Sequence, residues 1–210
     1  MRAVVFLDVL SHWCLASVPA VAALIESGAG VEIILAPLGD GAPLGMRADF
    51  EAWCYTRGTR AYGMELRSDW YEGPESTTWH ANAAVLAGAK LGGDLWRIAC
   101  AVMSEAMQGG AMFGRAETVN AFVAELGGVE PDAIAQLAQS DGVAAELRAG
   151  NRRLAKAGGD ERPTFRLENG NGDFALLKGL WQRDAALACA VALAGDEAAY
   201  AAAGAPPPAV

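Results

Sequence analysis

The sequence lacks several features that would point directly to a function. It has only two histidines, and none of its four cysteines shares a C-x-x-C motif with another, so we predict no metal site. Basic residues are outnumbered, 16 against 25 acidic ones, which leaves a net charge of -9. Because binding to nucleic acid or to an anionic membrane needs a surplus of positive charge, we expect neither as a partner.

Long apolar runs are also missing. The longest uncharged apolar stretch, residues 185–194, is half the length of a membrane-spanning helix. The apolar N-terminal run ends at Asp8 and is too short for a signal peptide. We therefore expect a soluble, cytoplasmic protein whose cysteines are free thiols.

Alanine is abundant, at about a fifth of the 210 residues, and it favours helices. Hydrophobic residues make up 53% of the chain and charged residues 20%, a composition typical of a folded protein. The length suits one large domain, or a small domain that carries an insertion.

Residues that favour strands gather at the two ends of the chain. Near the N-terminus, residues 3–10 and 31–37 are short apolar runs of the kind that form buried strands. Between them the pattern predicts one helix over residues 14–27. A β-α-β unit of this kind places its two strands in parallel.

Near the C-terminus, residues 163–168 and 173–178 flank Asn-Gly-Asn-Gly, which is a strong hairpin signal. A last helix is predicted over residues 182–194. In between, helical patterns are separated by glycine pairs, at residues 46–62, 76–89, 94–107, 116–126, 131–138 and 142–157.

This order predicts an α/β protein of two domains. Residues 1–45 and 159–197 form one domain with a single sheet, because neither end of the chain can cover both faces of its own strands. Residues 46–158 form an all-helical insertion, and residues 198–210 are expected to be a disordered tail.

Three local motifs accompany this order: Asp8-Val-Leu-Ser11-His12-Trp13-Cys14 after the first strand, Arg162-Pro163-Thr164-Phe165, and the hairpin turn followed by Gly179 and the last helix. Together they resemble the thioredoxin superfamily, in its DsbA-like branch with an inserted helical domain. That branch includes FrnE-type oxidoreductases, kappa-class glutathione transferases and 2-hydroxychromene-2-carboxylate isomerases. The resemblance implies a thioredoxin-like fold of order β-α-β, insertion, β-β-α.

The resemblance makes Ser11 and Cys14 the candidate catalytic residues. In the disulfide oxidoreductases, the positions of Ser11 and Cys14 hold the two cysteines of C-x-x-C at the start of the first helix. Because serine cannot form a disulfide, a dithiol cycle at this motif is excluded. In the kappa transferases and the isomerases the first position holds serine, which implies that Ser11 donates a hydrogen bond to the sulfur of bound glutathione.

Three hypotheses stay open. The resemblance implies first a DsbA-family, oxidoreductase-like enzyme with an atypical Ser-x-x-Cys motif, in which Cys14 is a lone redox thiol and glutathione supplies the second sulfur. The alternative is a glutathione-dependent transferase or isomerase that uses Ser11. Both are forms of thiol or glutathione-linked chemistry on a small-molecule or thiol substrate. In the third, Ser11 only caps the helix, Cys14 is a buried hydrophobe, and the fold is a catalytically degenerate binding protein.

The resemblance also implies substrate-binding positions at His12 and Trp13, and at Arg162, Pro163 and Thr164 in a cis-proline loop that would pair with an extended substrate. An arginine in this loop departs from the small apolar residue usual in the family. Its guanidinium would pair with a ligand carboxylate or point to solvent. The family often forms dimers, so a homodimer stays open as well.

A second departure follows Gly179. The kappa and isomerase patterns continue there into a polar pair that binds the glutamyl end of glutathione, whereas this chain has Leu180 and Trp181. Either Gln182 or Asp184 replaces that pair, or the glutamyl anchor is missing.

Several other residues are expected to be structural. We predict that His80 packs in a helix, that Arg152 and Arg153 lie on a solvated helix face, and that the remaining cysteines are inert; these are Cys54, Cys100 and Cys189.

Overall fold

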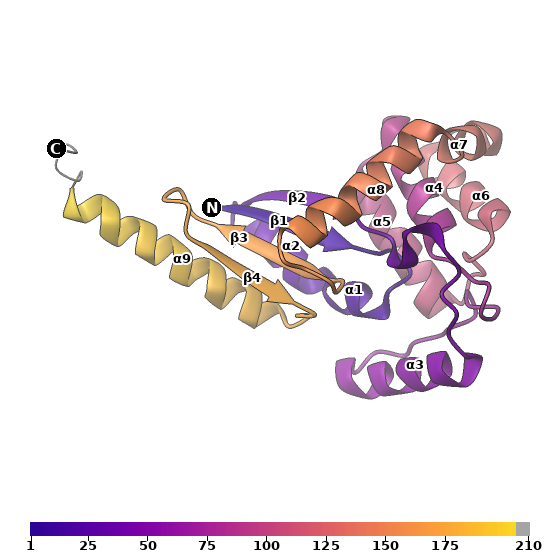
Figure 1. Ribbon diagram of the computed structural model, residues 1–210, viewed down its shortest axis with the longest axis horizontal. Helices are drawn as coiled ribbons and strands as arrows, with labels where there is room; N and C mark the ends of the chain where they lie inside the picture. Colours follow the sequence, from indigo (N-terminus) through magenta and orange to yellow (C-terminus); the bar gives the residue numbers. More distant parts are fainter. Residues whose placement is uncertain (205–210) are drawn as a thin grey trace.

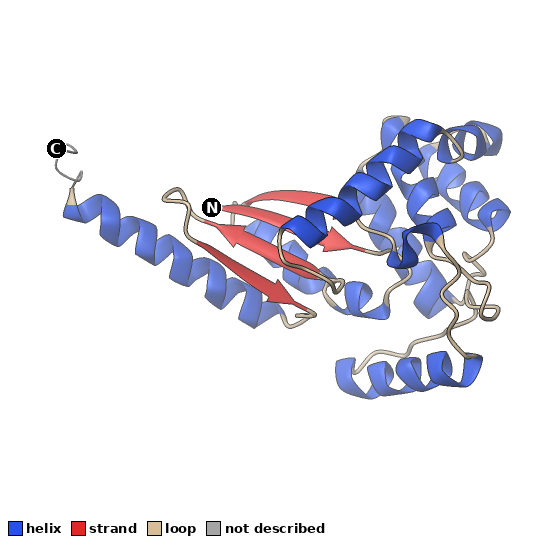
Figure 2. Ribbon diagram, viewed as in Figure 1, coloured by secondary structure: helices blue, strands red, loops and turns tan. Residues whose placement is uncertain are grey.

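The computed structural model describes residues 1–204, and both ends of the chain build one four-stranded sheet of order β2-β1-β3-β4 (Figure 2). Strand β1 (Arg2–Leu7) pairs in parallel with β2 (Gly30–Leu35) and antiparallel with β3 (Thr164–Glu168). The hairpin prediction is confirmed, because β3 pairs antiparallel with β4 (Phe174–Lys178). The predicted α/β fold class is therefore correct.

Helices cover both faces of this sheet (Figure 1). Helix α2 (Val18–Glu26) and helix α9 (Arg183–Ala203) pack together on one face, and α8 (Asp141–Lys156) crosses the other. The side chains of β1 point alternately to the two faces of the sheet, in agreement with these layers. Its residues Val4 and Phe6 pack with α8, while the residues between them face the main core.

The first predicted helix is two helices. Helix α1 (His12–Ala16) ends at Ser17, and α2 begins directly after it with Pro19 in its first turn. Proline has no backbone N–H to donate, which costs nothing in a first turn but would break a ladder of hydrogen bonds inside a continuous helix. The prediction of one helix over residues 14–27 was wrong for this reason.

The regular elements of the inserted segment are all helices, joined by loops of which the longest covers residues 63–78, and the segment, which is described in full, contains no strand. Its elements, in chain order, are η1 (Leu38–Gly41), α3 (Ala48–Tyr62), α4 (Trp79–Lys90), α5 (Leu95–Ser104), the π-turn η2 (Glu105–Gly109), α6 (Ala116–Gly127), α7 (Pro131–Ala138) and α8. Helix α3 lies apart from the other helices of the insertion (Figure 1) and packs against α1. This position makes α3 a wall for whatever lies beside α1.

Helix α9 is longer than predicted, since it continues to Ala203 instead of ending near residue 194. Residues 198–203, expected in a disordered tail, are therefore helical, as their alanine content favours; residues 205–210 lie outside the described part. By length and composition alone α9 could cross a membrane, because an 18-residue stretch of it has a mean hydropathy of 1.3. Only 11% of that stretch is buried in the protein. Its first half packs as a core helix does, through Ala186 and Ala190.

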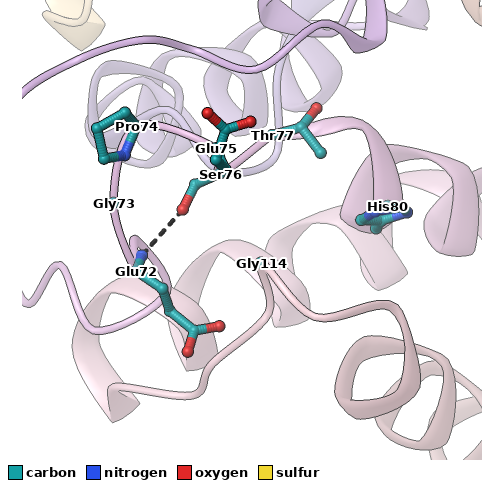
Figure 3. A pocket seen from close by; sticks show the side chains of 8 residues that line it. All are labelled: Glu72, Gly73, Pro74, Glu75, Ser76, Thr77, His80 and Gly114. Carbon is teal, nitrogen blue, oxygen red and sulfur yellow. Dashed lines mark hydrogen bonds between the residues drawn. The ribbon is translucent and has the colours of Figure 1, made fainter.

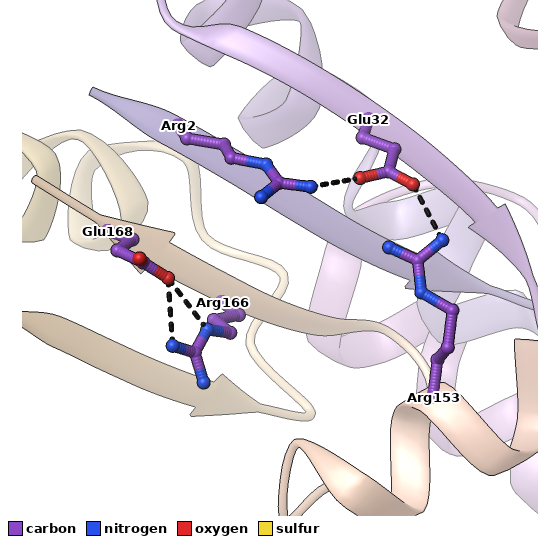
Figure 4. Close-up of polar contacts among 5 residues, drawn as sticks. All are labelled: Arg2, Glu32, Arg153, Arg166 and Glu168. Atoms are coloured by element: carbon purple, nitrogen blue, oxygen red, sulfur yellow. Dashed lines mark hydrogen bonds and ion pairs between the residues drawn. The ribbon is translucent and has the colours of Figure 1, made fainter. Parts of the chain in front are cut away.

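Ion pairs fasten α8 to the sheet. Glu32 on β2 lies 2.8 Å from an Arg2 nitrogen and 2.7 Å from an Arg153 nitrogen, and Arg166 pairs with Glu168 along β3 (Figure 4). Arg152 and Arg153 are both exposed, as expected for a solvated helix face, and Arg153 in addition pairs with the sheet. Because all of these groups are partly exposed, each pair contributes less than about 1 kcal/mol.

Candidate functional site

A cavity of about 330 Å³ opens beyond the end of β1, between the sheet domain and α3. Two helices contribute side chains that carry chemistry: α1 brings Ser11, His12 and Trp13 at its start, and α3 brings Glu51, Cys54 and Arg57. The loop before β3 adds Arg162. Residues far apart in the sequence therefore meet around Ser11, just beyond the end of β1.

Asp8 holds this corner of the fold together. Its carboxylate is fully buried, and one oxygen accepts hydrogen bonds from the Leu10 N–H (2.8 Å) and the Asn82 side chain (3.1 Å). The other accepts from the Leu38 N–H (2.7 Å) and the Thr78 hydroxyl (2.5 Å). Burial raises the pKa of Asp8, and the four hydrogen bonds oppose that shift. One side chain thereby joins the end of β1, the loop after β2 and the start of α4.

Ser11 faces the cavity, whereas Cys14 does not. Ser11 is the half-buried N-cap residue of α1, yet its hydroxyl makes no capping hydrogen bond. Cys14 is 0% exposed, and its sulfur accepts a hydrogen bond from the Asp8 N–H at 3.4 Å. Burial raises the pKa of the Cys14 thiol to about 12, so it stays protonated and enclosed. The hypothesis that Ser11 serves only as a cap loses its main support.

His12 and Trp13 both line the cavity, as the family resemblance implies. The Nδ1 atom of His12 lies 3.3 Å from the Tyr62 hydroxyl oxygen. Burial, and then the charge of Arg57, lowers the pKa of His12 to about 4, so the imidazole is neutral at pH 7. The Arg57 guanidinium also lies 5.9 Å from the centre of the Trp13 ring. These contacts join α3 to α1 across the cavity.

Arg162 is held in place by hydrogen bonds within the protein. Its guanidinium donates to the Ala36 carbonyl oxygen at 2.6 Å and to the Asn151 side chain at 2.7 Å. Longer bonds go to the carbonyl oxygens of Pro37 and Asp160. Because most of its donors are engaged within the protein, the side chain does not point freely to solvent. It also lines the cavity, and its contact with a ligand carboxylate stays a prediction.

The rest of the cis-proline loop lies behind the cavity. The Arg162–Pro163 peptide bond is cis, and Pro163 and Thr164 are both buried. The Thr164 hydroxyl donates to the Glu161 carbonyl oxygen at 2.8 Å. Pro163 and Thr164 do not line the cavity. The contact with a ligand that the resemblance implies for them therefore stays a prediction.

Helix α3 supplies a buried carboxylate that the sequence did not reveal. Glu51 is 6% exposed, and within residues 1–204 its carboxylate has no hydrogen-bond or ion-pair partner. In that part of the chain no fully enclosed polar side-chain atom lacks a partner, so the Glu51 oxygens open onto the cavity. Burial raises the pKa of Glu51 to about 7.

Cys54 and Arg57 were also missed, and Cys54 was expected to be inert on an apolar helix. Cys54 is half-buried and lines the cavity one turn after Glu51. Burial, and then the Glu51 charge, raises the pKa of its thiol. The only sequence signal was the i, i+3 spacing of Glu51 and Cys54, which places them on one face of α3. In a helix with so many polar residues that spacing identifies no particular face.

The loop after Gly179 does not restore a glutamyl anchor. Trp181 turns toward α3, where its ring centre lies 5.0 Å from that of Tyr62. Gln182 is exposed, the side chain of Asp184 is 94% exposed, and neither lines the cavity. The cavity therefore has no polar pair from this loop in its lining.

A second cavity, of about 300 Å³, lies in the insertion and shares no lining residue with the first. The Ser76 hydroxyl oxygen accepts a hydrogen bond from the Glu72 N–H at 2.9 Å, which shapes the loop along its rim (Figure 3). His80 lines this cavity and is exposed, which corrects the expectation of a packed histidine.

Glu51→Gln is expected to make stability less dependent on pH. Because the pKa of Glu51 is raised from 4.5 to about 7, the folded protein binds this proton more tightly than the unfolded chain does. The free energy of unfolding of the wild type therefore falls as the pH rises through this interval. At about pH 8 we expect the variant to be more stable than the wild type by about 1–3 kcal/mol.

Urea unfolding at acid and at alkaline pH measures this difference, which should vanish where Glu51 is protonated in both states. Glu65→Gln is the matched control, because Glu65 is exposed and its replacement is expected to change stability by less than about 0.5 kcal/mol. A stability difference for Glu51→Gln that does not grow with pH would contradict the assignment.

Comparison with known proteins identifies the fold. No protein-family model matches the sequence, and no curated protein matches it. Among solved structures, the cytosolic disulfide reductase DsbM from Pseudomonas aeruginosa superposes with a TM-score of 0.72 at 22% identity, over 90% of this chain and 96% of that one. The same protein solved with GSH gives a TM-score of 0.70 at 21% identity, over the same shares.

A 2-hydroxychromene-2-carboxylate isomerase superposes with a TM-score of 0.65 at 14% identity, over 98% of this chain and 100% of that one. At these identities the likeness is one of fold. It extends over 98% of this chain, and so over the sheet and the inserted helices alike. The chain therefore has the fold of the DsbA-like branch of the thioredoxin superfamily.

Proposed function

We propose that this protein binds a small-molecule thiol of the glutathione class and activates it at Ser11, as a transferase or isomerase. The observation that carries the proposal is the contrast between Ser11 and Cys14. Ser11 lines the cavity and its hydroxyl makes no capping bond, while the neighbouring Cys14 thiol is enclosed and protonated. In this arrangement the reactive sulfur comes from the ligand, and the protein supplies the hydrogen bond that favours its thiolate.

The comparisons support this proposal at the level of fold. One structural neighbour was solved with GSH, and another is named as an isomerase. The neighbour named as a disulfide reductase is described as cytosolic, and we extend that location to this protein. We do not extend its reductase activity, because this chain has serine at the first motif position and an enclosed thiol at the second.

A second candidate function is binding without turnover. It is favoured by the loop after Gly179, where Trp181 contacts Tyr62 and no polar pair is available for a glutamyl group. A ligand held at Ser11 without that anchor would be less firmly oriented, and orientation is a large part of catalysis.

Ser11→Ala is the test of the proposed function. A hydrogen bond to a charged sulfur contributes about 1.5–3 kcal/mol, so its loss is expected to lower kcat/KM with an aryl halide electrophile about 10–100-fold. The ultraviolet absorbance of the thiolate, followed while reduced glutathione is titrated into the protein, should shift to higher pH in the variant. Calorimetry of the same titration measures affinity.

Cys14→Ala and an insulin-reduction assay provide the contrast. We expect Cys14→Ala to keep its conjugation rate, and the wild type to leave insulin disulfides intact. Insulin reduction that disappears in Cys14→Ala would instead favour the lone redox thiol. Saturable glutathione binding with no thiolate signal would favour the binding protein.

A further inference from the structure

We propose that Glu51 is the proton acceptor for the thiol that binds beside Ser11, an inference that rests on the proposed function. The S–H bond of the ligand breaks, its electron pair stays on sulfur, and the proton moves to a Glu51 oxygen. Once the thiolate has reacted, the proton passes from Glu51 to water. Serine is not consumed, and no oxidant or reductant is needed.

The position of Glu51 carries this assignment. It lies in the first turn of α3 and lines the cavity that Ser11 lines from α1. It is 6% exposed, has no partner within the described residues, and its oxygens open onto the cavity. The cavity lining also includes apolar side chains, among them Met46 and Trp70. A carboxylate left unpaired in such a place costs stability, which a ligand or a proton would relieve.

The other groups at the cavity are less suited to the task. Those that carry charge or titrate are His12 from α1, Cys54 and Arg57 from α3, and Asp160, Glu161 and Arg162 from the loop before β3. Tyr55 and Tyr71 also lie close enough to Glu51 for its charge to raise the pKa of their phenols. Arginines have no proton to exchange near neutral pH, and the tyrosines are protonated there.

Two of the remaining groups are already engaged. The Nδ1 atom of His12 faces the Tyr62 hydroxyl, and an imidazole with a pKa of about 4 is a weak base. Asp160 is paired with Lys178 at 2.7 Å. Glu161 is exposed to water and has nothing to distinguish it from a surface carboxylate. Glu51 differs from all of these because its pKa of about 7 suits both the uptake and the return of a proton at neutral pH.

The test measures how many protons are released when glutathione binds, and it does not depend on catalytic turnover. Reduced glutathione is titrated into the wild type just above pH 7, in two buffers of different ionisation enthalpy, so that the binding heats report the protons released. Thiolate absorbance reports the thiol ionised. If Glu51 takes the proton, the wild type releases well under one proton per thiolate formed. In Glu51→Gln every thiolate formed must release a full proton to the buffer.

Activity provides an independent readout. Loss of a positioned base is expected to lower kcat with an aryl halide at least about 100-fold, and to remove the step near pH 7 from the pH–rate profile. The dissociation constant of glutathione should change less than about threefold, because the interaction of Glu51 with the ligand is limited to one transferred proton. Glu65→Gln, which removes the same charge from an exposed position, should match the wild type in all three measurements.

The outcomes separate the two proposals. A wild type that binds glutathione as thiolate and releases one proton per thiolate overturns the role of Glu51 but leaves Ser11 as proposed. Failure of the wild type to bind glutathione overturns both. The proton count on the wild type needs no variant, so the test survives even if Glu51→Gln fails to fold. Glu51→Asp, with its carboxylate set back by one methylene, should recover part of the rate.

Discussion

Replacing Asp8 by alanine is expected to lower the free energy of unfolding by about 3–5 kcal/mol. The variant removes an acceptor from four donors, three of them on buried residues, which come from three segments of the chain: the end of β1, the loop after β2 and the start of α4. Of these donors, the Asn82 amide keeps a second acceptor, the Thr78 carbonyl oxygen. Buried donors that lose their only partner cost far more than an average hydrogen bond contributes. Urea unfolding at neutral pH measures the loss.

Asp8→Asn separates charge from shape. It keeps the side-chain volume but turns one acceptor oxygen into an amide that faces a donor, so we expect about half the loss. Both variants should also impair glutathione binding, because the Leu10 N–H that Asp8 holds precedes Ser11 by one residue. If Asp8→Ala lowered the free energy of unfolding by less than about 1 kcal/mol, the side chain would not be what holds the end of β1, the loop after β2 and the start of α4 together.

Gly150→Ala is expected to cost about 3 kcal/mol or more, for a steric reason. Gly150 lies on the face of α8 that meets β2, and an added Cβ would lie 2.1 Å from the Leu35 carbonyl oxygen and 3.2 Å from an Ile34 methyl carbon. Neither β2 nor α8 can move away without disturbing the sheet or the next residue, Asn151, which holds Arg162. Thermal or urea unfolding measures the effect.

The same helix offers a matched control. Gly142 also lies in α8, but a Cβ there would have the Ser140 hydroxyl oxygen, at 3.9 Å, as its nearest neighbour. Gly142→Ala is therefore expected to stabilise the protein by up to about 1 kcal/mol through helix propensity alone. Equal changes in stability for the two substitutions would show that α8 does not contact β2 as closely as it does in the structure.

The predictions that held depend on local patterns. Short apolar runs at the two ends indicated strands, and Asn-Gly-Asn-Gly indicated the turn between β3 and β4, since these signals arise from neighbouring residues. The predictions that failed needed more than local propensity. Whether Pro19 lies inside a helix or at the start of a new one, and how far α9 extends beyond the sheet, depend on what each segment packs against.

By itself, then, the sequence determined the fold class and the place of Ser11 and Cys14 directly after the first strand, because both follow from residue types in order along the chain. Only the tertiary structure decided which side chains face Ser11. Glu51 resembles any glutamate of a polar helix until α3 folds over α1 and removes it from water. Burial and charge at the site depend on partners far away in the sequence, as for Asp8 and Thr78, which lie 70 residues apart.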